Sequence, residues 1–479
     1  MPTWPDVYIS PHILPVTQDW EHLLDIITTG PGLAALLLSD PAHDLGQYSV
    51  AALDPYLEVT YTAPRLQVSG PNDLHLSMRT PFPLDILDAL RRAHRPVLSS
   101  APYSCGAVGF LAYDFGRCLE DIYTQAHAFR PRIPDLEFRF YRSWLVLDHD
   151  SGDVTAFVNG VGATPAAARR DRVAAAGRLS RRLDLAGMDQ VVGSMPAPSP
   201  LHMEISREQY IRHIHRIHDY IRRGHVYQVN YSHPLRMEWN VPGPAILRRL
   251  LALQPVPFAA WLTTAGDQEI ISLSPECFLR RRGKVVETYP IKGTRPRGDT
   301  PAADAALQQD LLTSPKDGAE LAMIVDLERN DLGRVCAGGS VHVVEHRRLD
   351  TFRTLHHTRS LIRGVLQEQA DLAAILRATF PGGSVTGVPK IRCMQIIHEL
   401  EGEGRDIYTG SIGHLHLNGD FTLNIAIRTI LKRGDQLRFR MGGGIVMDSD
   451  PEAEFAETFH KAKAFQLAVR QAAAARPAP

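Results

Sequence analysis

Helical and strand-like segments follow one another irregularly along this chain, and this pattern restricts the fold more than any single motif does. Helical spacing of apolar residues occurs at 303–314, 316–326, 371–378, 389–400 and 452–473, and strand-like runs lie near residues 270, 341, 411, 423 and 440. Strict alternation of strand and helix, which builds a parallel sheet from βαβ units, is not seen. The pattern therefore predicts an α+β fold.

The N-terminal part of the chain is expected to be rich in strands. One half-buried strand begins at Leu136, and a turn at Gly152 and Asp153 leads to a second strand. Residues 164–186 are rich in Ala, Arg and Leu at helical spacing. The Pro- and Ser-containing stretch 191–200 has the composition of a linker. We therefore expect a strand-rich region at 1–190, a linker at 191–200, a second region at 201–470 and a tail at 471–479.

Composition excludes several classes of protein. The 479 residues are 44% apolar and 22% charged, and the formal net charge of -1 offers no field for nucleic acid or anionic lipid. No apolar run approaches the roughly 18 residues that span a bilayer, and the first residues lack the features of a signal peptide. The five cysteines form no Cys-x-x-Cys pair, so neither a disulfide framework nor a zinc site is expected. These features predict a cytoplasmic protein without membrane or nucleic-acid partners.

Lys292 lies where a strand is expected to end. The run Val285 to Tyr289 has strand character, Pro290 ends its hydrogen-bonding ladder, and Gly293 permits a sharp turn. A free lysine is only roughly 0.04% neutral at pH 7, so a nucleophilic lysine needs burial or a neighbouring cation that lowers its pKa. An isolated Lys-Gly pair is also typical of a solvated basic turn.

Three glutamates on two expected helices could form a metal site. Glu320 lies on one helix, whereas Glu454 and Glu457 lie one turn apart on the last helix, with Lys461 one turn further along the same face. Magnesium commonly takes one or two carboxylates, water and a substrate oxygen. Solvated glutamates on helix surfaces are the alternative interpretation.

Other side chains suggest an anion-binding site. Arg428 lies in an apolar, strand-like segment and needs an anion, which is either a structural carboxylate or a substrate carboxylate. The glycines from Gly442 lack the spacing of a dinucleotide-binding loop, but amide groups there could hold a carboxylate; close packing is the alternative. His356 and His357 face apart on a strand or a helix, so they are not expected to share a metal.

Several long motifs together resemble the chorismate-utilising enzymes. The matching segments are Ser274–Glu276, Pro290–Gly298, Val325–Val335, Phe380–Lys390, Ile425–Thr429 and Gly443–Glu457, with a weaker match at Cys105–Asp114. They cover most of 201–465. The resemblance implies that 201–470 binds chorismate and carries catalysis, and that the α+β fold has a central β-sandwich with surrounding helices.

Two positions separate the branches of this family. Relatives that add water to chorismate carry a lysine where this chain has Gln228. Relatives that form anthranilate carry an alanine where this chain has Lys292, and the aminodeoxychorismate-forming relatives carry a lysine there. The resemblance therefore implies an amino-transferring synthase that converts chorismate and ammonia to 4-amino-4-deoxychorismate, towards 4-aminobenzoate and folate. The alternatives are an anthranilate synthase component and a non-catalytic chorismate-binding subunit.

The resemblance also implies a role for each matching residue. Lys292 would attack C2 of chorismate, Glu276 would donate a proton to the leaving hydroxyl, and His357 would lie near the ring. A proton donor near pH 7 needs an apolar or carboxylate-rich setting around Glu276. The residues that would contact chorismate elsewhere are Arg428, Tyr408, Gly442, Lys461, Gly293, Thr294 and Gln228.

Magnesium and a partner subunit complete these expectations. The resemblance implies that Glu320 and Glu457, with Glu454 beside them, hold Mg²⁺ against the ring carboxylate. The chain contains no Gly-x-Cys-x-Gly nucleophile motif of a glutaminase. Ammonia is therefore expected from a separate glutamine amidotransferase subunit or from solution.

Overall fold

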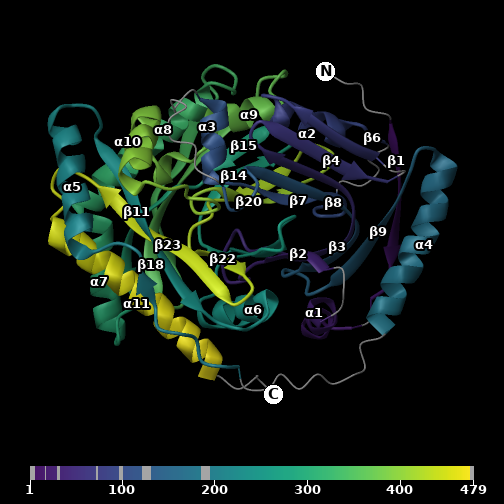
Figure 1. Ribbon diagram of the computed structural model, residues 1–479, viewed down its shortest axis with the longest axis horizontal. Coiled ribbons are helices and arrows are strands. Elements are labelled where there is room, and N and C mark those ends of the chain that lie inside the picture. The colour runs from purple at the N-terminus through teal and green to yellow at the C-terminus, as the bar shows by residue number, and fades with distance from the viewer. Residues whose placement is uncertain are drawn as a thin grey trace.

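Helices enclose an extensive set of β-strands in this protein (Figure 1). The computed structural model describes residues 6–16, 18–29, 33–71, 74–95, 101–120, 131–184 and 195–474. The expected α+β class is confirmed. The first part of the expected linker lies outside the described residues, and residues 195–200 have no regular secondary structure.

The first of two sheets begins in the N-terminal region and ends in the C-terminal region. Its hydrogen-bonded order is β6 (His94–Arg95), β1 (Val7–Leu14), β9 (Val154–Gly162), β8 (Leu136–Asp148), β3 (Tyr48–Thr62), β2 (Leu33–Leu38), β12 (Phe258–Thr263), β13 (Glu269–Ser274), β22 (Thr429–Arg433), β23 (Gln436–Ile445) and β11 (Gln228–Glu238). The short strands β10 (His202–Met203) and β19 (Gly387–Val388) also pair with β11. All of these pairs are antiparallel except β1 with β6.

The second sheet continues from the other halves of the long strands β3 and β8. Its order is β5 (Leu74–Arg79), β4 (Arg65–Gly70), β3, β8, β7 (Gly106–Leu111), β20 (Ser411–Leu415), β21 (Phe421–Asn424), β14 (Cys277–Arg282), β15 (Val285–Thr288) and β18 (Leu355–Val365). β16 (Ile291–Pro296) follows β15 along one edge of β18, and β17 (His342–Thr351) lies on the other edge.

The two sheets form the expected sandwich because their facing side chains make one apolar core. Ala52 and Ile270 of the first sheet share this core with Val108 and Ile412 of the second, and the large ring of Trp144 lies among them. The pairs β2 with β12 and β7 with β20 join the N-terminal strands directly to C-terminal ones. The strand-rich N-terminal region is therefore built into both sheets.

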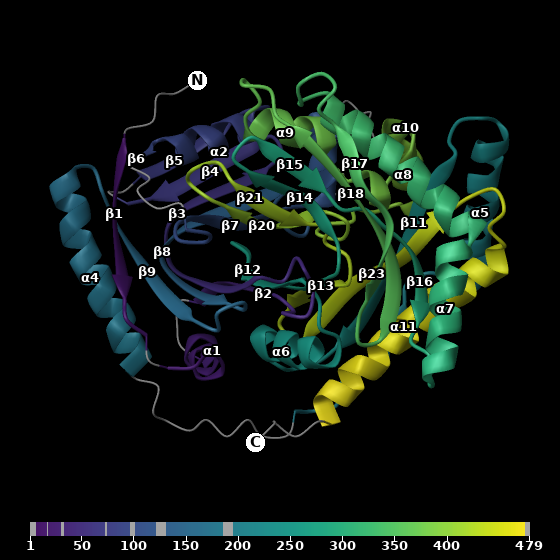
Figure 2. The same cartoon turned by 180° about the vertical axis from the view of Figure 1, so that it is seen from behind.

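Helices cover the outer faces of the sandwich (Figures 1 and 2). The helices that share a core with the first sheet are α1 (Trp20–Thr29), α4 (Pro165–Asp184), α6 (Gly243–Leu253) and α11 (Pro451–Ala474). Those that share a core with the second sheet are α2 (Pro83–Arg92), α8 (Pro315–Gly333) and α9 (Leu372–Thr379). α5 (Arg207–Arg222) and α10 (Lys390–Glu401) pack on β11, while α7 (Pro301–Thr313) contacts β16 and β18.

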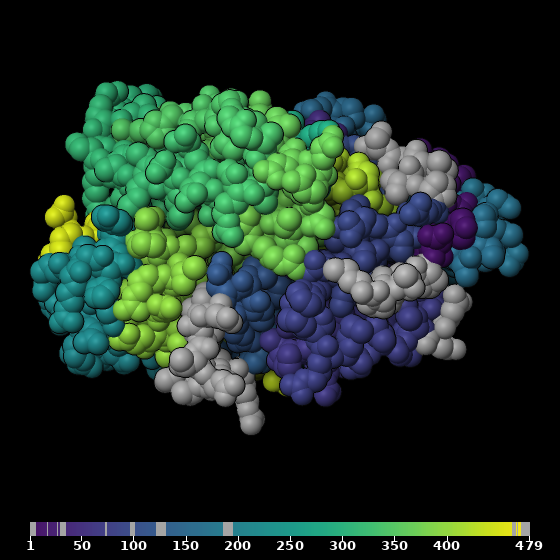
Figure 3. All heavy atoms as spheres, turned by 90° about the horizontal axis from the view of Figure 1, so that it is seen from above, coloured from purple at the N-terminus to yellow at the C-terminus, as the bar shows by residue number. Residues whose placement is uncertain are grey.

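The expected helices are all present, and two of them extend further than expected. α8 continues from the expected end near 326 to Gly333, and α11 continues into the expected tail as far as Ala474. The helices α1, α2 and α6 were not predicted. Seen from above, the segment around 300–400 forms a continuous face beside the N-terminal region (Figure 3). No helix in the described part of the chain is long and apolar enough to cross a membrane.

Candidate active site

Most of the expected site residues gather where the last strands of the two sheets approach each other. β16 carries Lys292 and β18 carries His357, whereas β11 carries Gln228 and β23 carries Gly442. The helices α8 and α11 bring the three glutamates to the same region, since Glu320 interacts electrostatically with Lys292 and Glu454, and Glu454 with Glu457. Folding therefore brings together segments that lie far apart in the sequence.

A β-bulge positions Lys292. The pairing of β16 with β18 shifts register between Lys292 and Thr294, so Gly293 is the extra residue of the bulge. Gly293 has φ = 71°, and a Cβ atom there would lie 2.7 Å from Cδ1 of Leu311. Only glycine meets both requirements without strain. The expected strand ends at Thr288, but Lys292 lies in a second strand, β16, and Gly293 forms a bulge within that strand in place of the expected sharp turn.

Lys292 is linked to Glu276 through one serine. The Lys292 amine donates a hydrogen bond to the Ser384 carbonyl oxygen at 2.9 Å, and the Ser384 hydroxyl donates to Oε1 of Glu276 at 2.6 Å. Ser384 belongs to the short 3₁₀ turn Gly383–Val385. Sequence analysis did not single out Ser384, because a glycine-rich turn gives no sign of which distant side chains it will meet.

Burial brings the pKa values of Glu276 and Lys292 closer to neutral pH. Burial raises the pKa of Glu276 to about 7, against the opposing effects of Ser384 and Lys292. Burial also lowers the pKa of Lys292, against the attraction of neighbouring carboxylates. Glu276 can therefore hold a proton near pH 7, and a larger fraction of Lys292 is neutral than in water.

A second buried carboxyl group, Glu328, lies beside this pair and was not predicted. The Thr288 hydroxyl donates to Oε2 of Glu328 at 2.9 Å. Burial and Glu276 raise the pKa of Glu328 to about 8. The helical spacing from Glu320 to Glu328 places both on the inner side of α8. This spacing was the signal in the sequence from which Glu328 could have been predicted as a site residue.

The two adjacent histidines face opposite sides of β18, as expected. Nε2 of His356 lies 2.9 Å from Oδ1 of Asp304, whereas Nδ1 of His357 lies 2.8 Å from the Thr294 hydroxyl and 3.2 Å from the Gly293 carbonyl oxygen. Burial and the Arg428 charge lower the pKa of His357 to about 3, and its buried Nε2 has no hydrogen-bond partner. His357 is therefore a neutral ring with one free nitrogen.

Arg428 is a buried cation that pairs with no carboxylate in the described part of the chain. It lies between β21 and β22 with φ = 52°, so the expectation that it lies within a strand was wrong: the chain passes there from the second sheet to the first. Burial lowers its pKa to about 10. Among the described residues its guanidinium forms no ion pair or hydrogen bond. The structural-carboxylate interpretation is therefore not supported, and the site can accept an anion.

The three predicted metal ligands approach one another from two helices. Burial raises the pKa of Glu320 and of Glu454, with further contributions from Glu454 and Glu457 respectively. Glu457 is more exposed and forms an ion pair of 2.7 Å with Lys461. No three metal-ligating side chains form a closed cluster in the described part of the chain. The mutual repulsion of these carboxylates is the kind that a bound dication relieves.

Gly442 and Lys461 lie together, but each already has a structural role. The Lys461 amine is 3.5 Å from the Gly442 carbonyl oxygen. Gly442 pairs with Ser232, and a Cβ atom there would lie 2.2 Å from the Tyr231 carbonyl oxygen. Close strand packing, the alternative interpretation, therefore explains this glycine. Its use as an anion-binding amide stays a prediction.

Gln228 and Tyr408 border the site. Gln228 is buried, a Cβ atom on Gly444 would lie 2.0 Å from its amide nitrogen, and its Oε1 has no hydrogen-bond partner among the described residues. Tyr408 is buried beside the guanidinium of Arg405. Backbone hydrogen bonds of 2.9 Å tie the segment after Tyr408 to Ala426, two residues before Arg428.

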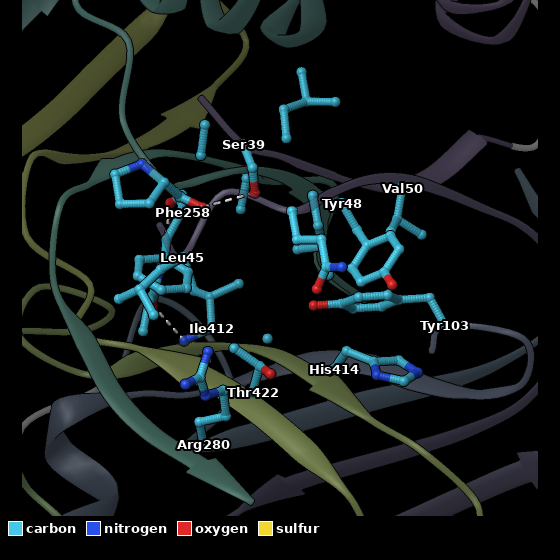
Figure 4. Close-up of a pocket in the computed structure, with 18 of the residues that line it drawn as sticks. Ser39, Leu45, Tyr48, Val50, Tyr103, Phe258, Arg280, Ile412, His414 and Thr422 are labelled. Atoms are coloured by element: carbon cyan, nitrogen blue, oxygen red, sulfur yellow. Dashed lines mark hydrogen bonds between the residues drawn. The ribbon is translucent and has the colours of Figure 1, made fainter. Parts of the chain in front are cut away.

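A separate cavity of about 80 Å³ lies away from these residues (Figure 4). Its lining includes Ser39, Asp44, Tyr48, Phe258, Arg280 and His414. The Ser39 hydroxyl donates to the Pro257 carbonyl oxygen at 2.8 Å. Asp44 also reaches β18, where it accepts two hydrogen bonds from Arg359 at 2.9 and 3.2 Å. The cavity wall is thus joined to the strand that carries His357.

Replacing Arg359 by leucine is expected to destabilise the fold by about 3 kcal/mol, because it leaves buried Asp350 without one of its cations. Arg359 is 1% exposed and lies 3.1 Å from Asp350. Arg348→Ala, in the same cluster but 41% exposed, should cost less than about 1 kcal/mol. Urea unfolding measures both changes. Equal costs would contradict a dominant role for the buried arginine.

Comparison with known proteins agrees with this geometry. The family model described as chorismate binding enzyme matches residues 47–467. Anthranilate synthase component 1 1 of Haloarcula marismortui is 39% identical over 380 residues, which cover 78% of this chain and 77% of that protein. Aminodeoxychorismate synthase component 1 of Bacillus subtilis is 37% identical over 368 residues, which cover 76% of this chain and 77% of that protein.

A solved structure shows the same fold. Anthranilate synthase component I from Streptococcus pneumoniae TIGR4 superimposes with a TM-score of 0.77 at 30% identity, covering 88% of this chain and 92% of that one. The chain belongs to the chorismate-binding enzyme family. Anthranilate synthase and aminodeoxychorismate synthase components are similarly close in sequence. Overall similarity therefore does not distinguish these two specificities, and the residues of the site have to be compared instead.

Proposed function

We propose that this chain is the synthase subunit of an aminodeoxychorismate synthase, which converts chorismate and ammonia to 4-amino-4-deoxychorismate for 4-aminobenzoate and folate biosynthesis. The observation that carries the proposal is the link from the Lys292 amine through Ser384 to Glu276. Anthranilate-forming relatives have alanine at the lysine position. Burial lowers the pKa of Lys292 and raises that of Glu276, and such a pair of shifted groups also argues against a non-catalytic subunit.

In this proposal Lys292 and Glu276 divide the chemistry. The neutral amine of Lys292 attacks C2, the two ring double bonds shift, and the C4–O bond breaks as Glu276 gives its proton to the departing hydroxyl, which leaves as water. Ammonia then attacks C4, the double bonds shift back, and Lys292 leaves C2 as a neutral amine. One proton of the new C4 ammonium restores Glu276, so the cycle is closed.

The proposed substrate position uses both ends of the site. Arg428, which has no anionic partner among the described residues, would bind the enolpyruvyl carboxylate with Tyr408 and the Gly442 amide. Lys461, which pairs with Glu457 in this structure, would turn to the same carboxylate. Gly293 and Thr294 would add contacts from the bulge, Gln228 would border the ring, and the free nitrogen of His357 would face it.

The glutamates of α8 and α11 would hold the opposite end of chorismate. Glu320 and Glu457, with Glu454 beside them, would bind Mg²⁺, which would neutralise the ring carboxylate when bound. Burial and, to a smaller extent, mutual repulsion raise the pKa of Glu320 and Glu454, and a bound dication would offset both effects, which supports this assignment. We also propose a cytoplasmic location, because all five cysteines are free thiols.

Product analysis separates the proposal from its nearest rival. Purified chain would be incubated with chorismate, magnesium and an ammonium salt, and the products would be resolved by liquid chromatography and mass spectrometry. The proposal predicts 4-amino-4-deoxychorismate without release of pyruvate. Anthranilate with an equal amount of pyruvate would instead identify an anthranilate synthase component, and no turnover at all would indicate a non-catalytic subunit.

The purified chain should use ammonium salts but not glutamine. Free ammonia is scarce at neutral pH, so we propose that a separate glutamine amidotransferase subunit supplies it. Turnover with ammonium should rise at alkaline pH as more ammonia is neutral. The measurement is the rate of chorismate consumption with each nitrogen source. Turnover by the chain alone with glutamine would contradict the two-subunit proposal.

A further inference from the structure

Arg405 is a buried cation that the proposed reaction does not use. It lies in the loop 402–410, which joins α10 to β20 and also carries Tyr408. Its side chain is 1% exposed, and its counter-ion is Glu401, whose carboxylate is fully buried and lies 2.7 Å away. An arginine held this far from solvent needs acceptors inside the protein for its remaining N–H groups.

The guanidinium of Arg405 donates hydrogen bonds to three separate segments. One terminal nitrogen donates to the Val385 carbonyl oxygen at 3.1 Å and to the Thr409 hydroxyl at 3.2 Å. The other donates to the Asn230 carbonyl oxygen at 2.6 Å. The planar fork of a guanidinium can hold several acceptors at once in a fixed arrangement, which a single ammonium cannot do.

The first of these segments is the turn that contains Ser384. Val385 follows Ser384 directly in this 3₁₀ turn. The Ser384 carbonyl oxygen accepts the hydrogen bond of the Lys292 amine, and the Ser384 hydroxyl donates to Glu276. The guanidinium therefore binds the residue next to the one that links the proposed nucleophile to its proton donor.

The other two segments border the proposed position of chorismate. Asn230 lies two positions after Gln228 on β11, and its amide donates to the Thr386 carbonyl oxygen at 2.9 Å, just after the 3₁₀ turn. Thr409 follows Tyr408, whose ring centroid lies 5.8 Å from the guanidinium carbon. One side chain thus connects the turn, the strand and the loop that carry proposed site residues.

We infer that Arg405 is a positioning residue for the proposed reaction. It fixes the Ser384 turn, strand β11 and the loop 402–410 relative to one another, and so keeps the Lys292 amine and its proton donor aligned with bound chorismate. Without these links the reacting groups would be present but displaced, and a displacement of about 1 Å can cost roughly 100-fold in rate. This inference rests on the proposed function and adds a residue to it.

The N-terminal motif Cys105–Asp114 supports this arginine. Oδ2 of Asp114 accepts the N–H of Asp406 at 2.8 Å, and its Oδ1 accepts the N–H of Arg405 at 3.4 Å. Asp406 has φ = 51°, a left-handed conformation that is uncommon for a residue with a side chain and that persists where its surroundings hold it. The ring centroid of Tyr113 lies 4.6 Å from the guanidinium carbon. The motif therefore holds both the backbone and the side chain of Arg405.

Arg405→Lys tests this inference, because lysine keeps the positive charge beside Glu401 but brings one nitrogen in place of three. Glu401 also keeps Arg440, 2.6 Å away, so the variant leaves no unpaired buried carboxylate. With chorismate and an ammonium salt, kcat should fall about 10- to 100-fold because the Ser384 turn loses its anchor. The KM for chorismate should rise as well, because the loop that carries Tyr408 loses the same anchor.

Arg440→Lys is the matched control. Arg440 is also buried and pairs with the same Glu401, but its further hydrogen bonds reach Ser232 and Glu403, not the Ser384 turn. This variant should keep a kcat close to that of the wild type, even where urea unfolding shows a comparable loss of stability. An equal fall of kcat in both variants would show a general effect on the fold and would overturn the inference.

A second variant separates the loop from the turn. Asp114→Asn leaves the guanidinium in place and keeps one acceptor oxygen, but it weakens the support of the loop backbone. It should therefore raise the KM for chorismate with little change in kcat. A fall of kcat in Asp114→Asn as large as that expected for Arg405→Lys would contradict a separate role of the guanidinium at the turn.

Hydrogen exchange followed by mass spectrometry gives a readout that needs no substrate. The amides of Asn230, Thr386 and Thr409 are hydrogen-bonded in this structure, and they report on the three segments. In Arg405→Lys their peptides should exchange faster, whereas peptides from β4 should exchange as in the wild type. Wild-type exchange in all three segments of the folded variant would overturn the inference. Failure of the wild type to form 4-amino-4-deoxychorismate would refute the proposed function separately, because exchange requires no turnover.

Discussion

Replacing Lys292 by alanine is expected to lower the rate of 4-amino-4-deoxychorismate formation by about two to four orders of magnitude, the range that loss of a participating side chain costs. The substitution removes the amine that attacks C2 and leaves both proposed carboxylate-binding ends of the site in place. Chorismate binding should therefore survive while turnover is lost. Steady-state rates with ammonium, together with a binding titration, measure the two quantities.

The control for this variant is Lys284→Ala. The Lys284 side chain is 70% exposed and pairs with Glu368 at 3.5 Å, so its loss should leave turnover unchanged. Partial recovery of Lys292→Ala in excess ammonia would support direct attack of ammonia as a slow residual route. If the variant consumed chorismate at the wild-type rate, Lys292 would not be the nucleophile.

Glu320→Gln and Glu457→Gln are each expected to abolish magnesium-dependent activity. Each change removes one anionic ligand from the proposed site, and the loss of affinity should exceed the roughly 10–100-fold that loss of an outer-shell partner costs. Isothermal titration of magnesium in the presence of chorismate measures this affinity. Folding should be little changed, because Glu457 is 58% exposed and burial already disfavours the charge of Glu320.

Glu452→Gln is the matched control for the magnesium site. Glu452 lies on the same helix as Glu457, but its carboxylate is 53% exposed and pairs with Arg207 at 2.5 Å. Its removal should leave magnesium affinity within experimental error of the wild type. Unchanged affinity in both Glu320→Gln and Glu457→Gln would eliminate the proposed site.

Local sequence patterns predicted part of the secondary structure near the site. The end of a strand before Pro290 depends on neighbouring residues, and so does the opposite orientation of His356 and His357. Such features follow from side-chain periodicity and backbone preference, which act over a few residues. The prediction that Arg428 lies within a strand was wrong because its apolar neighbours are typical of a strand, and the sequence gives no sign of its positive φ angle.

Contacts between distant segments could not be derived from the sequence. Ser384 meets Lys292 and Glu276 across 92 and 108 positions, and Arg359 meets Asp44 across 315. No local pattern predicts these contacts, since they depend on the spatial order of the strands in the two sheets. The resemblance to a family pointed to the proposed nucleophile and proton donor but assigned nothing to Ser384.

The most direct test of the central claim is to trap the bond between Lys292 and the substrate ring. Enzyme in excess would be mixed with chorismate and magnesium without ammonia, quenched within one turnover and digested for mass spectrometry. The account predicts that the peptide containing Lys292 gains the mass of chorismate minus one water, and that ammonia added before the quench removes this adduct. Consumption of chorismate in the same single turnover with ammonia, without any adduct on Lys292 at any time, would contradict the account.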